Sequence, residues 1–499
     1  MELKFDTTPC RCLRRIMREV KNMEMTQEIR LPDGMPDIGR IIGAWGQVIL
    51  RSKEWRGGSI SASGGVMARV LYAPDDGTEV RCVDAWLPLQ GKWDLPDTDR
   101  EGVIRLMPLL RSADARTVSA RKMMVRTGVG ILAEALIPYE EGVCIPGELP
   151  EGVEILKNVY PVKLPREAAE KTFLLDEELP LPASCPPVEK ILRFEMRPQI
   201  LDNKVMAGKM VFRGSGLLHV LYLGQDGQIY SHCFDLPFSQ FGDLEEEFGQ
   251  DACANVSTAV TSLELDVTDD GTLRLKCGMV AQYLVWDLLM LELAEDAYSP
   301  NREISPKFRE LMLPTVLEER RERLNCEISM DVECARVVDV CFYPDHPRVS
   351  KAGERTEGEL SGVFQLLYED ADGALQSAAK HWEQPWSIEG ADETVTMLEV
   401  LADGAVSAVS GAGTVQMKGD IGLFVVTEGE RGQWMLCGME AGEIKEPARD
   451  RPSLILRRAE GERLWDIAKS CGTTVQAICQ ANELQSEPAP GQMLLIPMP

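Results

Sequence analysis

One pattern of apolar positions occurs three times along the chain. In each copy an apolar, β-branched run ends on a Leu-Tyr pair, three residues follow, and then comes an Asp-Gly pair. Glycine accepts a positive φ because it has no Cβ, so a run that closes on Asp-Gly predicts a β-hairpin. We expect the tyrosines to serve cross-strand packing and the glycines to serve the turns. These structural residues are Tyr72 with Gly77, Tyr222 with Gly227, and Tyr368 with Gly373.

The repeated unit is a whole domain, because successive copies are separated by about 150 residues, a usual domain size. Alternating polar and apolar runs flank the hairpins, as in 259–267 and 273–286, and this alternation predicts antiparallel strands. The fold class is therefore mainly β, with three tandem sandwich-like modules at 29–162, 176–300 and 324–442.

Segments outside these modules have helical patterns. Between residues 10 and 25, apolar residues recur at i, i+3, i+4 and i+7, which predicts an N-terminal helix within 1–28. Prolines followed by strong helix formers predict helical connectors at 165–171 and 301–323. A charged stretch punctuated by prolines at 443–452 predicts a linker.

The last part of the chain has a different pattern. Residues 453–458 alternate as a strand does, and the apolar residues from Leu464 to Cys471 then share one helical face. Thr474 is placed to cap a second helix, and 492–496 is typical of a closing strand. The pattern therefore predicts a small β-α-α-β domain.

Composition and charge narrow the class of function. The chain has 499 residues, is 44% hydrophobic and 27% charged, and is thus an ordinary globular protein. Its net charge of −27 argues against nucleic acid or an anionic membrane surface as the main partner. It has no apolar run of membrane-spanning length and no signal-peptide core, so we expect a cytoplasmic protein. The 14 cysteines lack the spacing of zinc ligands, so we expect them to be small buried hydrophobic residues. We therefore expect no metal and no cofactor.

Two resemblances give these elements a functional setting. Gly461-Glu-Arg-Leu-Trp-Asp-Ile-Ala468 and Pro490-Gly-Gln-x-Leu-x-Ile-Pro497 resemble the helix-1 and closing-strand signatures of LysM domains, so 453–499 is identified as such a domain. The three hairpins, with Asp235-Leu-Pro-Phe238 after the second, resemble the SPOCS domains of endospore-forming bacteria. SPOCS modules followed by a terminal LysM domain is the layout of SipL-type spore-coat morphogenetic proteins.

The SipL-type resemblance implies a non-enzymatic adaptor in the mother-cell cytoplasm at the forespore surface. Its LysM domain would dock onto the ATPase of the coat basement layer, and its SPOCS modules would help coat proteins to encase the spore. The LysM resemblance alone implies N-acetylglucosamine polymers such as peptidoglycan. A protein that tethers itself to cell wall or spore cortex is therefore the second hypothesis, and the lack of an export signal favours the first.

The LysM resemblance also implies a binding rim, formed by the loop after strand 1 and the loop after helix 2. The rim residues are Gly461, Glu462, Arg463, Leu464, Asn482, Glu483, Leu484 and Gln485. Arg463 replaces the family's short capping side chain, a loss of ~1 kcal/mol of helix stability that also favours a protein partner over a sugar. Trp465 is either a core residue or an interface anchor at this rim.

Catalytic chemistry has little support in the sequence. There are four histidines, they occupy different places in their modules, and His219 lies inside a predicted strand as a satisfied residue. No Gly-x-Ser-x-Gly, His-Glu-x-x-His or P-loop motif occurs. We therefore expect no enzymatic activity.

Overall fold

The fold was analysed in a computed structural model that describes residues 2–96, 100–269, 271–389, 394–411, 413–444 and 452–498. It is 76% strand and 3% helix, which confirms the mainly β class. Within the described ranges the helices are α1 and α2 of the C-terminal domain, and neither is long enough to cross a bilayer.

Each of the three modules consists of two antiparallel sheets that pack on each other. In module 1, strands β3, β4 and β5 form one sheet, and β2, β7 and β6 form the other. The strands are β2 (Asp6–Arg30), β3 (Ile38–Arg56), β4 (Ser59–Pro74), β5 (Arg81–Asp94), β6 (Val103–Ser119) and β7 (Lys122–Ile145).

Module 2 repeats this arrangement, with β9, β10 and β11 in one sheet and β8, β13 and β12 in the other. The strands are β8 (Glu154–Leu179), β9 (Val188–Met206), β10 (Lys209–Gly224), β11 (Ile229–Asp243), β12 (Cys253–Val267) and β13 (Leu273–Tyr298).

Module 3 adds short strands to the same plan. Its first sheet contains β15 to β18, and its second contains β14, β20 and β19, with the N-terminal strand β1 (Glu2–Lys4) paired to β20. The strands are β14 (Arg302–Asp331), β15 (Arg336–Pro344), β16 (Arg348–Ala352), β17 (Arg355–Glu369), β18 (Leu375–Glu389), β19 (Thr394–Gly411) and β20 (Thr414–Ile444).

The three predicted hairpins are confirmed. They join β4 to β5, β10 to β11 and β17 to β18, and the turn glycines Gly77, Gly227 and Gly373 have φ of 71°, 78° and 76°. Tyr72 and Tyr222 are fully buried, whereas Tyr368 is half-buried. These tyrosines therefore serve packing at the end of each hairpin strand.

The segment expected to be an N-terminal helix is strand β2, so that prediction is wrong. β2 pairs with β7 along its whole length, with a β-bulge between Arg15 and Met17. Before the bulge, Cys10 and Cys12 are buried, and both are even-numbered. After the bulge, Met23 packs on the core, and it is odd-numbered. A bulge shifts the alternation by one residue, which produced a spacing that resembles a helix.

The predicted helical connectors are also wrong. Residues 165–171 lie in β8, and the predicted connector 301–323 lies in β14 from residue 302 onward. Each of these is an edge strand paired on one side only. An edge strand tolerates proline because one row of its N–H groups needs no partner in the sheet. Long cross-strand pairing then outweighs helix propensity, so each connector is the opening strand of its module.

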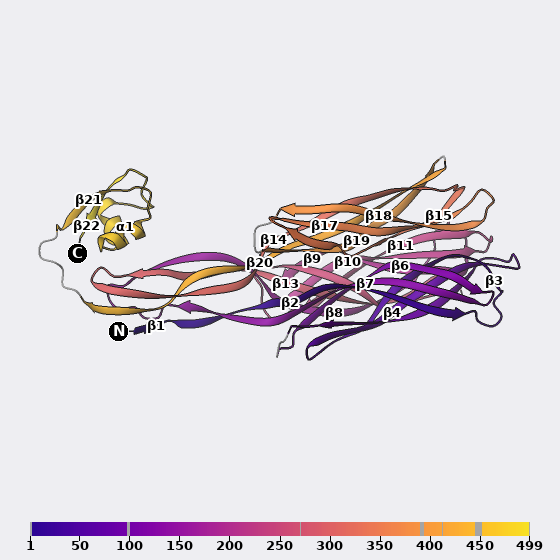
Figure 1. Cartoon of the computed structure of the whole chain (residues 1–499), viewed down its shortest axis with the longest axis horizontal. Coiled ribbons are helices and arrows are strands. Elements are labelled where there is room, and N and C mark those ends of the chain that lie inside the picture. Colours follow the sequence, from indigo (N-terminus) through magenta and orange to yellow (C-terminus); the bar gives the residue numbers. More distant parts are fainter. Residues whose placement is uncertain are drawn as a thin grey trace.

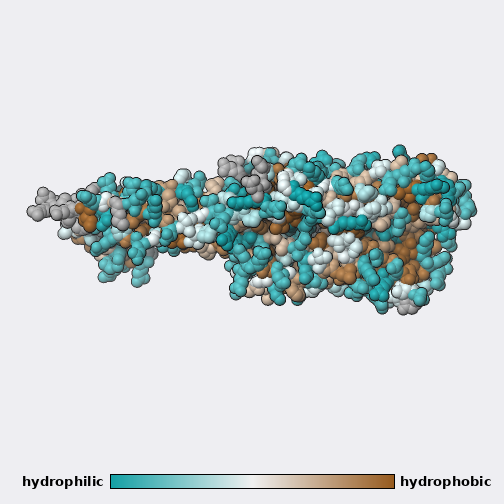
Figure 2. Space-filling view, turned by 90° about the horizontal axis from the view of Figure 1, so that it is seen from below, coloured by the Kyte–Doolittle hydropathy of each residue, from teal (hydrophilic) through white to brown (hydrophobic). Residues whose placement is uncertain are grey.

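The outer ends of the three long strand pairs leave the body as a narrow arm, here called the stalk (Figure 1). The pairs are β2 with β7, β8 with β13, and β14 with β20. Their inward side chains form a shared core that contains Cys10, Cys12, Val143, Cys144, Val162, Leu164, Leu293, Leu311, Leu313 and Met435. Figure 2 shows the same narrow arm and broader body from a second side.

The C-terminal domain has the predicted β-α-α-β order. It consists of β21 (Leu454–Arg458), α1 (Leu464–Cys471), α2 (Val475–Asn482) and β22 (Met493–Pro497). Thr474 caps α2 by accepting a hydrogen bond from Ala477 N, as expected. Gly472 ends α1 in the left-handed conformation. The domain lies beside the tip of the stalk (Figure 1).

Candidate functional site

The two predicted rim loops of the C-terminal domain come together. Leu464 N, at the start of α1, donates a hydrogen bond of 2.7 Å to Glu487 Oε2 from the loop after α2. Arg463 precedes the helix and makes no side-chain cap, as its length suggested. Glu487 therefore satisfies one of the free N–H groups at the start of α1, and the sequence pattern did not point to it.

Two charged side chains of the rim already have hydrogen-bond partners elsewhere in the domain. Arg463 makes two hydrogen bonds to Asp466, at 3.0 and 3.3 Å. Glu462 accepts from Arg457 at 2.9 Å and from Glu460 N at 2.7 Å. These bonds fix the orientation of both side chains and use part of the hydrogen-bonding capacity that they could offer to a sugar.

The second rim loop is mainly structural. The amide of Asn482 bonds to both backbone groups of Leu495 and so fixes α2 to β22. Glu483 caps α2 with a φ of 55°, Leu484 packs on the domain core, and Gln485 is exposed. Of the rim residues in this loop, Glu483 and Gln485 present exposed side chains to solvent.

Trp465 is a buried contact with the stalk, which combines the two roles considered for it. Its side chain is 6% exposed and its indole N–H donates to Asp296 of β13 at 2.9 Å. The Trp465 ring meets Tyr298 edge-on, with centroids 4.7 Å apart. Lys469 also binds Asp296, at 2.7 Å, and the Tyr298 hydroxyl donates to Thr473 O at 2.9 Å.

The outward face of the two-stranded β21–β22 sheet carries a cluster of exposed apolar side chains. Four side chains on this face are between 38% and 61% exposed: Leu454, Leu456, Met493 and Leu495. Leu456 and Leu495 are directly opposite each other in the two strands. The alternation in both strands was the signal for this face, since Leu494 and Ile496 fill the core between them. We call these four residues the apolar face.

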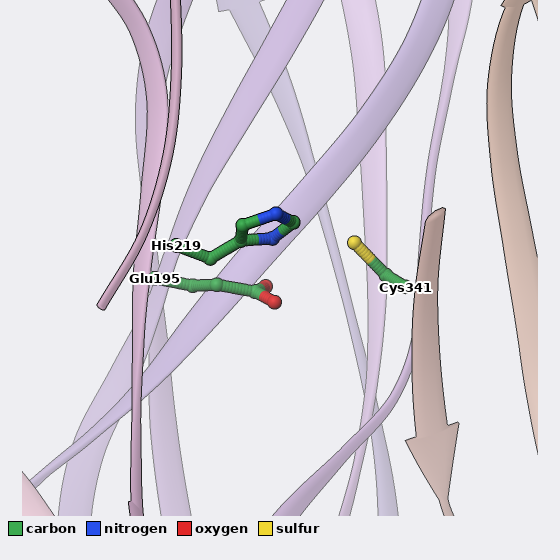
Figure 3. A group of neighbouring side chains, drawn as sticks. All are labelled: Glu195, His219 and Cys341. Carbon is green, nitrogen blue, oxygen red and sulfur yellow. The ribbon is translucent and has the colours of Figure 1, made fainter. Parts of the chain in front are cut away.

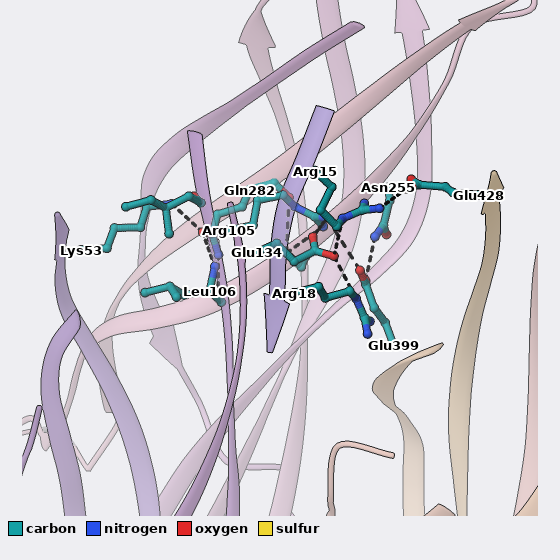
Figure 4. A network of polar contacts seen from close by, with 12 residues as sticks. Arg15, Arg18, Lys53, Arg105, Leu106, Glu134, Asn255, Gln282, Glu399 and Glu428 are labelled. Atoms are coloured by element: carbon teal, nitrogen blue, oxygen red, sulfur yellow. Dashed lines mark hydrogen bonds and ion pairs between the residues drawn. The ribbon is translucent and has the colours of Figure 1, made fainter. Parts of the chain in front are cut away.

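A buried ionic network joins the three modules inside the body (Figure 4). Glu134 accepts from Arg105 at 2.7 Å and from Arg18 at 3.0 Å, and Arg15 lies 3.3 Å away. Arg15 also pairs with Glu428 of module 3. Burial alone would raise the pKa of Glu134, but the three arginines outweigh it and hold that pKa at about 2.

The same network reaches modules 2 and 3 through a further carboxylate and two side-chain amides. Arg105 lies 3.7 Å from Glu399 of module 3, which accepts from Asn255 of module 2 at 2.7 Å. Gln282 of module 2 bonds to both backbone groups of Leu106 in module 1. Because these contacts cross from one module to another in the interior, the network ties the modules together.

A second polar cluster brings together three potential metal ligands, Glu195, His219 and Cys341, within 4.8 Å (Figure 3). His219 Nδ1 lies 3.2 Å from Arg193, a permanent donor, so its lone pair is engaged and Nε2 carries the proton. Glu195 accepts from Arg197 at 2.7 Å, and burial raises the pKa of the Cys341 thiol. The arrangement does not fit a cation and instead ties module 2 to module 3.

Fold and site together define a modular β scaffold with a small binding domain at the tip of its stalk. Among family models, "SipL, SPOCS domain" matches residues 187–268, which run from the start of β9 to the end of β12. The LysM domain model matches residues 459–497. The chain therefore carries the SPOCS and LysM domains of the SipL-type architecture, and these domains support a sporulation-related adaptor of the peptidoglycan-binding type. No curated protein and no solved structure matches the chain.

Proposed function

We propose that the protein is a non-enzymatic adaptor of endospore coat assembly. It acts in the mother-cell cytoplasm at the forespore surface. The LysM domain binds a protein of the coat basement layer, its morphogenetic ATPase, and the three β modules present other surfaces to the proteins that encase the spore. The SPOCS and LysM matches supply the setting, and the surface of the LysM domain supplies the preference for a protein partner.

The observation that carries this proposal is the apolar face. Exposed apolar side chains that cluster on one face favour a protein partner, because burying them releases water without any need for polar pairing. Leu454, Leu456 and Met493 are each at least half exposed although the opposite side of their sheet is fully packed. The rim, by contrast, offers a sugar few unbonded groups, and Trp465, the domain's one aromatic residue, is buried.

Binding of peptidoglycan remains the second proposed function, because the matched domain is of a glycan-binding type. It would use the exposed rim side chains Glu483 and Gln485 together with Arg463, after Arg463 leaves Asp466. The two proposals therefore assign binding to different faces of one small domain.

A binding assay with the full chain separates them. The chain is presented to the purified coat-basement ATPase and, separately, to purified peptidoglycan. Leu456→Glu places a charge on the apolar face, and we expect it to weaken capture of the ATPase at least tenfold. Leu201→Glu, at an equally exposed apolar residue of the body, is the matched control. Saturable binding to peptidoglycan alone, unaffected by Leu456→Glu, would contradict the protein-partner proposal.

A further inference from the structure

The LysM domain is held against the stalk by a small and specific set of contacts. Asp296 accepts from the Trp465 indole at 2.9 Å and from Lys469 at 2.7 and 2.8 Å. Tyr298 packs on the indole ring and donates to Thr473 O. Leu156 of β8 packs on the same cluster, so the core of the LysM domain extends onto the stalk.

Among the residues that the structure describes, the scaffold side chains named in this contact all belong to module 2. Tyr298 pairs with the first residue of β8, and the residues that pair with the first residues of β2 and β14 are Ile145 and Ile444. The repeated architecture therefore offers three similar stalk strands, of which one carries a carboxylate and a phenol in this place. That difference indicates a surface adapted to the LysM domain.

Asp296 and Tyr298 are two positions apart on one strand. Alternate residues of a strand point to the same side, so the carboxylate and the aromatic ring face α1 together. The face of α1 complements them, with the Lys469 ammonium and the Trp465 N–H for the carboxylate and the indole ring for the phenol. This face thus recognises an extended Asp-x-Tyr segment.

We propose that the α1 face of the LysM domain, Trp465 with Lys469, is a second interaction surface that binds extended acidic-aromatic segments, and that the stalk segment around Asp296 and Tyr298 occupies it in cis. A partner with such a segment has to displace the stalk. The apolar face stays uncovered in both states. The cis contact stands independently of the proposed function, whereas the competition with a coat partner rests on it.

The contact between the stalk and the LysM domain has a polar part and an apolar part, and a competing segment can replace both. The Asp296 side chain is 22% exposed and that of Lys469 is 44% exposed, so water and salt screen their attraction. Trp465 and Tyr298 are buried against each other and supply the apolar part of the contact. A segment with the same two groups can therefore replace the ion pair and the aromatic contact of the stalk, and only the packing of Leu156 is lost.

The cis contact is tested in the full chain through the Trp465 indole N–H. Indole signals are recorded by ¹⁵N NMR after tryptophan labelling, and Trp465→Phe assigns the signal. In Asp296→Ala we expect hydrogen exchange at this N–H to accelerate at least tenfold. Glu292→Ala is the control, because Glu292 lies on the same strand and pairs with Lys157 at 2.8 Å. Equal exchange in the wild type and Asp296→Ala would overturn the cis contact.

The recognition of acidic-aromatic segments is tested with a synthetic peptide that has the sequence of residues 292–300. It should bind Asp296→Ala at least fivefold more tightly than the wild type, in which the stalk competes. A peptide in which alanine replaces the residues equivalent to Asp296 and Tyr298 should not bind. Equal binding of both peptides would overturn the assigned recognition.

The same variant separates this inference from the proposed function. If the wild type captures the coat-basement ATPase and Asp296→Ala captures it several-fold more tightly, the competition is supported. Equal capture by both would overturn the competition and leave the adaptor proposal standing. Loss of capture by both would contradict the adaptor proposal, while indole exchange would still decide the cis contact.

Discussion

Two carboxylates in this molecule each contact positively charged side chains, but one carboxylate is buried and the other is partly exposed. Glu134, in the body, is fully buried and faces Arg15, Arg18 and Arg105. Asp296, at the stalk, remains partly exposed and faces Lys469 and an indole N–H. The first holds three arginines of module 1, two of which also face Glu428 and Glu399 of module 3. The second joins the scaffold to the LysM domain.

The difference lies in what happens when each contact breaks. Removing one member of a buried ion cluster leaves other charges in a medium of low polarity, a penalty of about 3–5 kcal/mol. Breaking an exposed pair returns both groups to water, and such pairs contribute about 0–1 kcal/mol. Burial therefore makes the module junction the stronger contact, whereas the partly exposed ion pair is the part of the LysM contact that water and salt weaken.

The largest expected effect is that of Glu134→Ala. Three arginines lose their shared acceptor, so the free energy of unfolding should fall by about 3–5 kcal/mol. Urea denaturation of the full chain, followed by far-ultraviolet circular dichroism, measures it. Glu140→Ala, which breaks an exposed pair with Arg11, should change it by less than about 1 kcal/mol. Equal effects of the two variants would remove the distinction between the two kinds of contact.

The second-largest expected effect is a loss of stability at the module junction around Glu134 when the pH is lowered. The pKa of Glu134 is about 2 in the fold and near 4.5 in the unfolded chain, so its contribution is present above pH 4.5 and is lost as the pH falls toward 2. The loss should be about 2–3 kcal/mol. Burial raises the pKa of Glu428, which acts in the opposite direction and reduces the net change.

Denaturation series at several pH values measure this loss. The Glu134→Gln variant is the control, because it cannot titrate at this position and should show a flatter dependence between pH 4.5 and 2. An unchanged pH dependence in Glu134→Gln would show that other carboxylates govern acid unfolding.

A smaller effect, confined to the LysM domain, is expected from Thr474→Ala. The Thr474 hydroxyl accepts from Ala477 N and caps α2, so its loss should destabilise this domain by about 1 kcal/mol. Hydrogen exchange in α2 should accelerate while the β modules keep their protection. Gln476→Ala, at an exposed position of the same helix, should change neither region. Faster exchange throughout the scaffold would show that the two regions unfold together.

The smallest expected effect on the scaffold is that of Asp296→Asn. It weakens a partly exposed contact, so the unfolding of the β modules should change by less than about 1 kcal/mol. The unfolding midpoint by tryptophan fluorescence and circular dichroism measures this. A loss comparable to that of Glu134→Ala would mean that the LysM domain is an integral part of the scaffold.

The sequence predicted the hairpins well because their signal is local. A Leu-Tyr pair and an Asp-Gly turn fix both the strand end and the positive φ of Gly77, Gly227 and Gly373. The order of elements in the LysM domain was predicted for the same reason, since Gly472 and Thr474 mark helix ends by their own chemistry.

The opening strands were mispredicted because their structure depends on distant partners. β2 pairs with β7, more than a hundred positions away at its outer end, and its bulge disturbs the alternation that identifies a strand. The roles of Trp465 and Glu134 could not be predicted from neighbouring residues, because they too depend on partners that are distant in the sequence. Trp465 meets Asp296, and Glu134's partner Arg15 meets Glu428, only after the modules have assembled.

The most direct test of a permanent scaffold with a releasable LysM domain is hydrogen exchange by mass spectrometry on the full chain. Amides at the centre of β7, around Glu134, should exchange only through global unfolding. Amides of α1 should exchange faster, through a local opening that added salt promotes by screening Asp296 and Lys469. Equal protection of both regions, insensitive to salt, would contradict this division.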